Sequence, residues 1–215
     1  MKKIAVILFI ILPAFITKAQ TITNHIVEPK GVYSEIDTKN DIRVMTSLLD
    51  PQNSTKSKLI DSIIQSPNNY DPPVLYVLSN VFFTSGKYND AIFWFYLAQL
   101  RARYDVNRCA DKTASAAQYN QTFGLDINQY AFAHLDDLEK IIPKVIEFER
   151  SNEENYDQRW INLTGMNAMS SALADKADNK PLSKAKDEWP AIKKGTIADY
   201  EEGFKQALIS LKKKQ

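Results

Sequence analysis

Cysteine, histidine and glycine are scarce in this chain of 215 residues. Because Cys109 is the only cysteine, no disulfide can form within the chain, and stability must come from burial of apolar side chains. With two histidines and six glycines, the chain has no paired zinc motif, phosphate-binding glycine loop, nucleophile elbow or calcium loop. The sequence therefore indicates no metal, no cofactor and no catalytic residue, and favours a protein that is not an enzyme.

Cys109 and His134 are the two side chains for which reactivity is conceivable. Cys109 is expected in the first turn of a helix beside Arg108, where the helix dipole and the cation would favour a thiolate that could pair with His134. The other interpretation is a small buried cysteine and a histidine on an exposed acidic face. We expect the second, because no local signature surrounds either residue and one imidazole is a weak metal signal.

A continuous apolar run occurs at the N-terminus. Lys2 and Lys3 precede the apolar residues 4–16, and the small-residue site Thr17-Lys18-Ala19 follows them. This order predicts a bacterial signal peptide over residues 1–19, cleaved near Gln20. A retained anchor is the alternative, but the run is shorter than the ~20 residues that span a bilayer. We expect an exported protein, periplasmic or extracellular, without stable membrane insertion after cleavage.

The charges of the chain are nearly balanced, with 27 basic and 26 acidic residues. Loss of the three lysines in residues 1–19 would leave a small acidic excess. A surface for nucleic acid needs a clustered basic excess, and the sole dense basic run is the lysine tail at 212–214, which suits the C-terminal end of a helix. The composition therefore excludes a general nucleic-acid-binding class.

No window alternates apolar and polar residues as a half-buried strand does, so the expected fold class is all-α. Residues 20–36 are expected to be an irregular N-terminal arm. Residues 37–215 are expected to be a single α-helical domain, a compact multi-helix bundle. The helices are expected at about 38–50, 54–66, 72–85, 88–103, 107–122, 126–150, 159–173 and 190–213.

Single residues set several of these boundaries. Asp71 before two prolines is expected to cap the helix that follows. Asn107 is expected to cap another helix, and Gly124 to end it. Asp126 is expected to open a long helix, which Pro143 should kink or divide.

Small and large residues recur at helical spacing between positions 72 and 105. They are Leu75, Leu78, Ser79, Phe82, Gly86, Tyr88, Ala91, Phe95 and Ala98. With this spacing the segment resembles one tetratricopeptide repeat, although Leu75 replaces the aromatic residue, Ser79 replaces the glycine and the late proline is absent. The resemblance implies a helical hairpin, and in proteins of this type the concave face binds peptides. One copy is found, so the other helices must cover its apolar faces.

Residues 91–98 are all apolar or aromatic, which is typical of a helix surrounded by others. We therefore expect the helix at 88–103 to be the centre of the bundle, with its aromatic side chains in the core. The alternative is that Trp94 or Tyr96 lines a peptide groove.

Arginine, tyrosine and tryptophan, the residue types that dominate binding hot spots, gather around the expected hairpin. Together with Trp94 and Tyr96 they are candidates for a partner-binding surface. The alternative is an internal network in which Asp105, Asp111 and Asp157 neutralise the arginines. The full candidate set is Trp94, Tyr96, Arg101, Arg103, Tyr104, Arg108, Arg159 and Trp160.

These observations predict an exported, non-catalytic protein-binding or structural module, such as an envelope adaptor or an immunity-type protein, with a protein or peptide partner. The alternative is an exported hydrolase acting on cell-wall material. That activity would need two carboxylates in a cleft, about 5–9.5 Å apart, one of them with a raised pKa.

Overall fold

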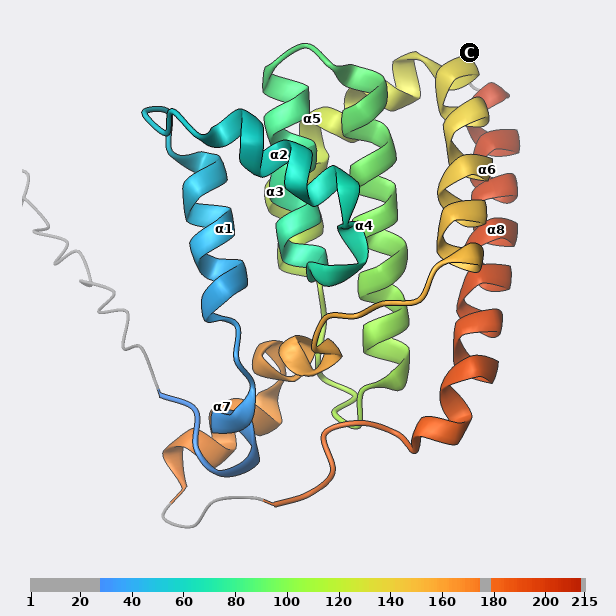
Figure 1. Ribbon diagram of the computed structural model, residues 1–215. Coiled ribbons are helices and arrows are strands. Elements are labelled where there is room, and N and C mark those ends of the chain that lie inside the picture. Colours follow the sequence, from blue (N-terminus) through green and yellow to red (C-terminus); the bar gives the residue numbers. More distant parts are fainter. Residues whose placement is uncertain (1–27, 175–178, 214–215) are drawn as a thin grey trace, which may run out of the picture.

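The computed structural model describes residues 28–174 and 179–213, and the predicted signal peptide lies outside this part of the chain. The described residues form an all-α, compact helical bundle, as the sequence predicts (Figure 1). The α-helices are α1 (Lys39–Leu49), α2 (Lys56–Gln65), α3 (Pro72–Thr84), α4 (Tyr88–Arg108), α5 (Ala117–Ala133), α6 (Leu135–Ser151), α7 (Met166–Leu173) and α8 (Trp189–Lys212). Short 3-10 helices are η1 (Gly31–Glu35), η2 (Pro67–Asn69), η3 (Gln158–Thr164) and η4 (Lys186–Glu188).

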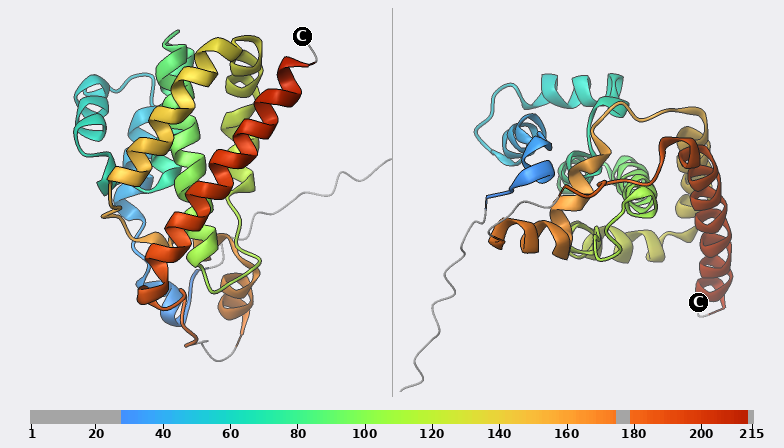
Figure 2. Two further views of the ribbon diagram at one scale, coloured as in Figure 1. Left: turned by 90° about the vertical axis from the view of Figure 1, so that its right-hand side faces the viewer. Right: turned by 90° about the horizontal axis from the view of Figure 1, so that it is seen from below.

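Helix α4 lies at the centre of the bundle and packs against α3, α5, α6 and α8. Figure 2 shows α6 and α8 side by side across one flank of α4, while α1 covers α3 on the other side. Ile92, Phe95 and Leu97 have no exposed surface although they point in different directions around the helix. The central position predicted for this helix is confirmed.

The expected hairpin is formed by α3 and α4. The carboxylate of Asp71 accepts a hydrogen bond from the backbone N–H of Val74, so Asp71 caps α3 as predicted. Gly86 turns the chain with a φ of 75°, a conformation that favours glycine. Ser79 and Ala91 are fully buried, which lets the two helices approach closely. Membership of the tetratricopeptide type stays a prediction.

The prediction that a new helix begins at Asn107 is wrong. Helix α4 continues to Arg108, and Cys109 then adopts an extended conformation. An ion pair of 2.6 Å between Asp105 and Arg108 spans the last turn of α4 and supports its extension. Gly124 lies inside α5 rather than at its end. A Cβ at this position would lie 2.7 Å from the Phe95 ring, so the glycine serves the close approach of α5 to α4.

The prediction that one long helix begins at Asp126 is also wrong. Helix α5 begins at Ala117 and ends at Ala133. His134, whose φ of −125° and ψ of 59° are not helical, separates it from α6. Pro143 lies within α6, which continues past it to Ser151. The division therefore falls before the proline, at His134.

Helices α1 and α2 lie at the edge of the bundle (Figure 1). Leu48 and Ile63 are buried, whereas Ile42, Leu49 and Ile64 are exposed. Each of these helices is covered along one narrow stripe, because few neighbours surround it.

A second, smaller apolar cluster lies apart from the main core. It joins Tyr33 and Ile36, at and just after η1, to Ala168 of α7 and to Leu182. The described part of the N-terminal arm is therefore packed against the protein. The helix expected at 159–173 is divided into η3 and α7.

Candidate functional site

Trp94 and Trp160 are enclosed, with side chains 6% and 3% exposed, and Tyr96, which is 4% exposed, only borders a hollow of about 320 Å³ between α4, α5 and α8. The prediction that these aromatic residues face a partner is wrong for this fold. Tyr96 donates a hydrogen bond to Asn128 of α5, and Trp160 donates one to Asp105. Their polar atoms are used inside the bundle.

Arg101 is also buried and forms an internal ion pair. Its Nε lies 2.8 Å from Oε2 of Glu149, and neither side chain has exposed surface. The same guanidinium donates to the carbonyl of Pro67 and to the side chain of Asn68. Arg101 thus ties α4 to α6 and to η2, which is a structural task rather than contact with a partner.

Arg108 belongs to a second buried network, centred on Asp105. Arg108 donates to Oδ1 of this carboxylate, while Tyr156 and Trp160 donate to Oδ2 at 3.0 and 2.7 Å. Burial raises the pKa of Asp105 to about 6, although Arg108 acts in the opposite direction. The expected internal network is confirmed for this residue. Asp111 instead accepts hydrogen bonds from Thr113 and from the backbone of Asn167.

Arg103 and Arg159 lie away from these networks. Arg159 pairs with Asp157 at 2.7 Å, the second expected ion pair, and lies 3.8 Å from Glu35. Arg103 is exposed, and its guanidinium carbon is 5.2 Å from the centre of the Tyr200 ring. The candidate residues are therefore spread over the molecule and do not form one surface.

Tyr104 and Arg108 do share a site, a cleft of about 830 Å³ between the end of α4, the loop after α6 and the start of α8. The Arg108 guanidinium is stacked between two rings, 4.1 Å from the centre of Tyr104 and 4.7 Å from that of Trp189. Burial raises the pKa of Tyr104 to about 12. The other lining residues are Arg150, Glu153, Glu154, Lys186, Pro190, Lys193, Lys194, Ile197, Ala198 and Glu201.

The local backbone explains why Trp189 reaches the end of α4. Residues 182–184 run beside Cys109 in an isolated antiparallel bridge, with Lys184 donating to the carbonyl of Arg108 at 2.8 Å. The Trp189 indole donates to the carbonyl of Lys184, and Pro190 occupies the first turn of α8. This start of α8 is therefore fixed against α4 from two sides.

Glu154 lines the cleft, and the fully buried Glu149 lies behind it, with Lys193 within 4 Å of both carboxyl groups. The carboxyl groups of Glu149 and Glu154 are in hydrogen-bonding contact, and Lys193 donates to Glu154 at 2.8 Å. Burial and the contact with Glu154 raise the pKa of Glu149 to about 8. Burial alone would raise the pKa of Glu154, but the hydrogen bonds from Glu149 and Lys193 lower it to about 2. One proton held by the pair supplies a partner for Oε1 of Glu149, which otherwise has none.

This pair predicts that the protein loses stability as pH rises above 5. A raised pKa in the folded state means that stability is fully present below the unfolded pKa of about 4.5 and is lost as pH approaches 8. At about 1.4 kcal/mol per pKa unit, with allowance for coupling, the free energy of unfolding should fall by roughly 2–4 kcal/mol from pH 5 to 8. Urea denaturation across this range measures the fall.

The control for this prediction is Glu147→Gln, an exposed change on the same helix, which should leave the pH dependence unchanged. Glu149→Gln should make the fall smaller, because the amide does not titrate, and the part that remains includes the contribution of Asp105, whose pKa is also raised. An equally steep fall in the Glu149→Gln protein would contradict the assignment.

Cys109 and His134 do not come together as a reactive pair. Cys109 follows the C-terminus of α4 and donates to the side chain of Asn162, so the expected place in a first turn is wrong. Burial raises the pKa of its thiol to about 11, opposite to what a nucleophile requires. Within residues 28–174 and 179–213, no three histidine, cysteine or acidic side chains gather in a group that could hold a metal ion.

Sequence reasoning missed Trp189, Lys193, Glu149 and Glu154. The sequence predicts that a helix begins near Pro190. It does not show that the ring of Trp189 contacts Arg108, because Arg108 lies on another helix. The adjacent acids Glu153 and Glu154 are expected on the surface from the sequence, which holds for Glu153 but not for Glu154, whose side chain is 6% exposed.

No protein-family model matches the chain, and comparison with curated proteins and with solved structures gives no match either. In the described part of the chain, no helix is both long enough and apolar enough to cross a membrane.

Proposed function

We propose that this protein is an exported, non-catalytic protein-binding module, and that the cleft formed by Tyr104, Arg108 and Trp189 is its binding site. The cleft is the observation that carries the proposal. It places the half-buried ring of Trp189, a residue type enriched at binding hot spots, in a concavity large enough for a short peptide segment. Tyr104 and Arg108, each 4% exposed, support this ring from behind. The sequence at residues 1–19 supports export, and the α3–α4 hairpin supports a module of the tetratricopeptide type.

The carboxyl groups near the cleft favour binding over hydrolysis. Oε2 of Glu149 is held by Arg101 at 2.8 Å, so this carboxyl group is occupied inside the bundle. Glu149 also has no exposed surface with which to touch a substrate. Its proton serves the network with Arg101 and Lys193.

A photo-crosslinking amino acid at position 198 tests the proposal. Ala198 lines the cleft, whereas Ala207 is a matched control on the same helix that lines a smaller hollow of about 320 Å³. The modified protein would be expressed and illuminated in its native cell. We expect one protein of the exported fraction to be crosslinked at position 198, and the reciprocal crosslink to be obtained from that partner.

The same partner captured equally at positions 198 and 207 would place the interface outside the cleft. No crosslink at either position, together with cleavage of cell-wall material by the purified protein, would overturn the proposal in favour of the hydrolase.

A further inference from the structure

The cleft combines an apolar wall with charged side chains at its rim. Trp189 is half-buried, whereas Trp94 and Trp160 are almost fully enclosed, so Trp189 is the tryptophan that a ligand can reach. Pro190 and Ala198, both exposed, continue this wall along α8. An apolar side chain placed here would lose contact with water against the Trp189 ring.

Most charges that line the cleft are already neutralised by neighbours. Arg108 is paired with Asp105, Lys193 with Glu154 at 2.8 Å, and Arg150 with Glu201 at 3.3 Å. These side chains set the shape of the cleft but have little charge to offer a ligand.

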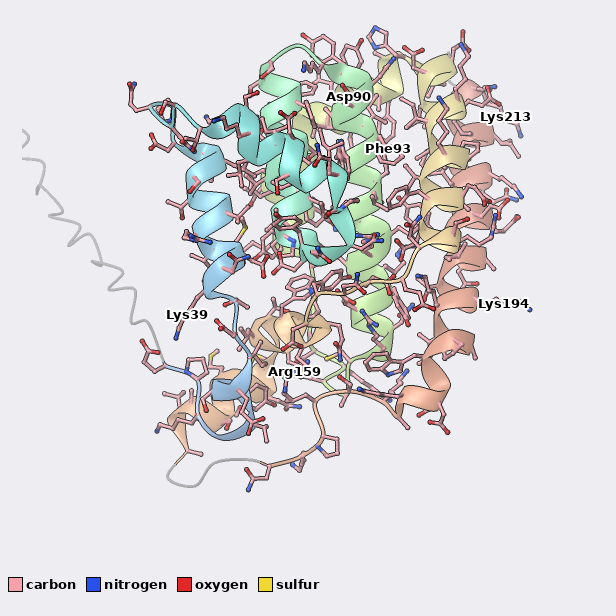
Figure 3. All side chains as sticks on the ribbon, viewed as in Figure 1. Lys39, Asp90, Phe93, Arg159, Lys194 and Lys213 are labelled. Carbon is pink, nitrogen blue, oxygen red and sulfur yellow. The ribbon has the colours of Figure 1, made fainter. Side chains whose placement is uncertain are left out.

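Two lysines at the rim differ from the others. Lys186 and Lys194 form no ion pair with any residue of the described chain. Among the acids that line the cleft, Glu153 likewise has no ion pair there, whereas Glu154 and Glu201 are paired. Lys186 lies 5.9 Å from the centre of the Trp189 ring. Figure 3 shows Lys194 on the outer side of α8, directed into solvent. The unpaired charge at the rim is therefore positive in balance.

The buried groups beneath the rim do not offset this positive balance. Arg101 and Lys193 face Glu149 and Glu154, so two cations meet two carboxyl groups and no negative charge is left over. A basic ligand would therefore meet repulsion at the rim, whereas an acidic ligand would be attracted there.

We propose that the cleft binds an acidic segment of the partner protein, with one aromatic or aliphatic side chain against Trp189 and carboxylates beside Lys186 and Lys194. This inference rests on the proposed function and names the chemistry of the partner. The volume of about 830 Å³ fits a short segment rather than a folded surface.

A random heptapeptide library displayed on phage tests the inference without assuming a ligand. Peptides retained by the purified protein should be enriched in aspartate and glutamate next to phenylalanine, tyrosine, tryptophan or leucine. Their affinity, measured by the fluorescence change of Trp189, should fall roughly tenfold in Lys186→Ala/Lys194→Ala, because each surface charge contributes up to ~1 kcal/mol. The matched control is Lys212→Ala/Lys213→Ala, which removes the same charge at the far end of α8 (Figure 3).

Iodide and caesium quenching of tryptophan fluorescence gives a second test that needs no peptide. Iodide should quench Trp189 more than caesium does, and the difference should disappear in Lys186→Ala/Lys194→Ala but not in the control. Enrichment of basic or uncharged peptides, equal binding by the lysine variant, or stronger quenching by caesium would overturn the inference. Each of these results would leave a crosslink at position 198 intact, so failure of the inference is distinguishable from failure of the proposed function.

Discussion

Replacing Arg101 by methionine is expected to lower the free energy of unfolding by about 3–5 kcal/mol, a large part of the stability of an ordinary domain. The Arg101 side chain has no exposed surface and holds Glu149 at 2.8 Å and the Pro67 carbonyl at 3.0 Å. Methionine fills a similar volume but leaves a buried carboxyl group and a buried carbonyl without their donor. Urea denaturation followed by circular dichroism measures the loss.

Arg150→Met is the matched control, because Arg150 is on the surface of α6 with a side chain 51% exposed. It should change stability by less than about 1 kcal/mol. The double change Arg101→Met/Glu149→Leu should recover most of the loss, since an apolar pair leaves no unpaired charge. If Arg101→Met costs no more than the control, the pair does not hold α4 to α6.

Replacing Asp105 by alanine is expected to have an effect of similar size, about 3–5 kcal/mol. The Asp105 carboxylate accepts hydrogen bonds from Arg108, Tyr156 and Trp160, so its removal leaves three buried donors unsatisfied. Arg108 would also lose the contact that holds it against Tyr104. The change should therefore reduce partner binding as well as stability, and both can be followed on the same purified protein.

Asp157→Ala is a suitable comparison for Asp105→Ala. Asp157 also accepts from an arginine, but its side chain is 32% exposed and water can replace the lost contact. Asp105→Leu/Arg108→Met should be more stable than Asp105→Ala alone, because it removes the unpaired cation. A stability loss no larger for Asp105 than for Asp157 would show that the buried network contributes little.

Local signals in the sequence were sufficient for much of the fold. Asp71 before two prolines marks the start of α3, and the run of apolar residues after Gly86 identifies the central helix. Each of these two signals consists of residues that are adjacent in the sequence. Gly124 and Asn107 misled because their roles depend on distant residues: Gly124 makes room for Phe95, and Asn107 lies in a helix whose last turn is stabilised by a buried ion pair.

The candidate site was harder to predict than the helices. Arg108 and Tyr104 were selected for their residue types, and they do line the cleft with Trp189. Arg101 was selected for the same reason and is fully buried. Sequence composition cannot separate these cases, because both arginines pair with buried carboxylates and they differ in position along α4: Arg108, in the last turn, borders the cleft, whereas Arg101 is enclosed by α6 and η2.

The small cluster of Tyr33, Ile36, Ala168 and Leu182 has a consequence for the order in which the fold opens. Its members come from opposite ends of the chain, so it closes a loop around the whole bundle, and few apolar contacts offset the entropy of that closure. Segments of this kind exchange their amide hydrogens by local opening, without global unfolding. Leu182 directly precedes the residues that hold Trp189 against α4. Release of η1 would therefore loosen the mouth of the cleft while the central helices remain folded.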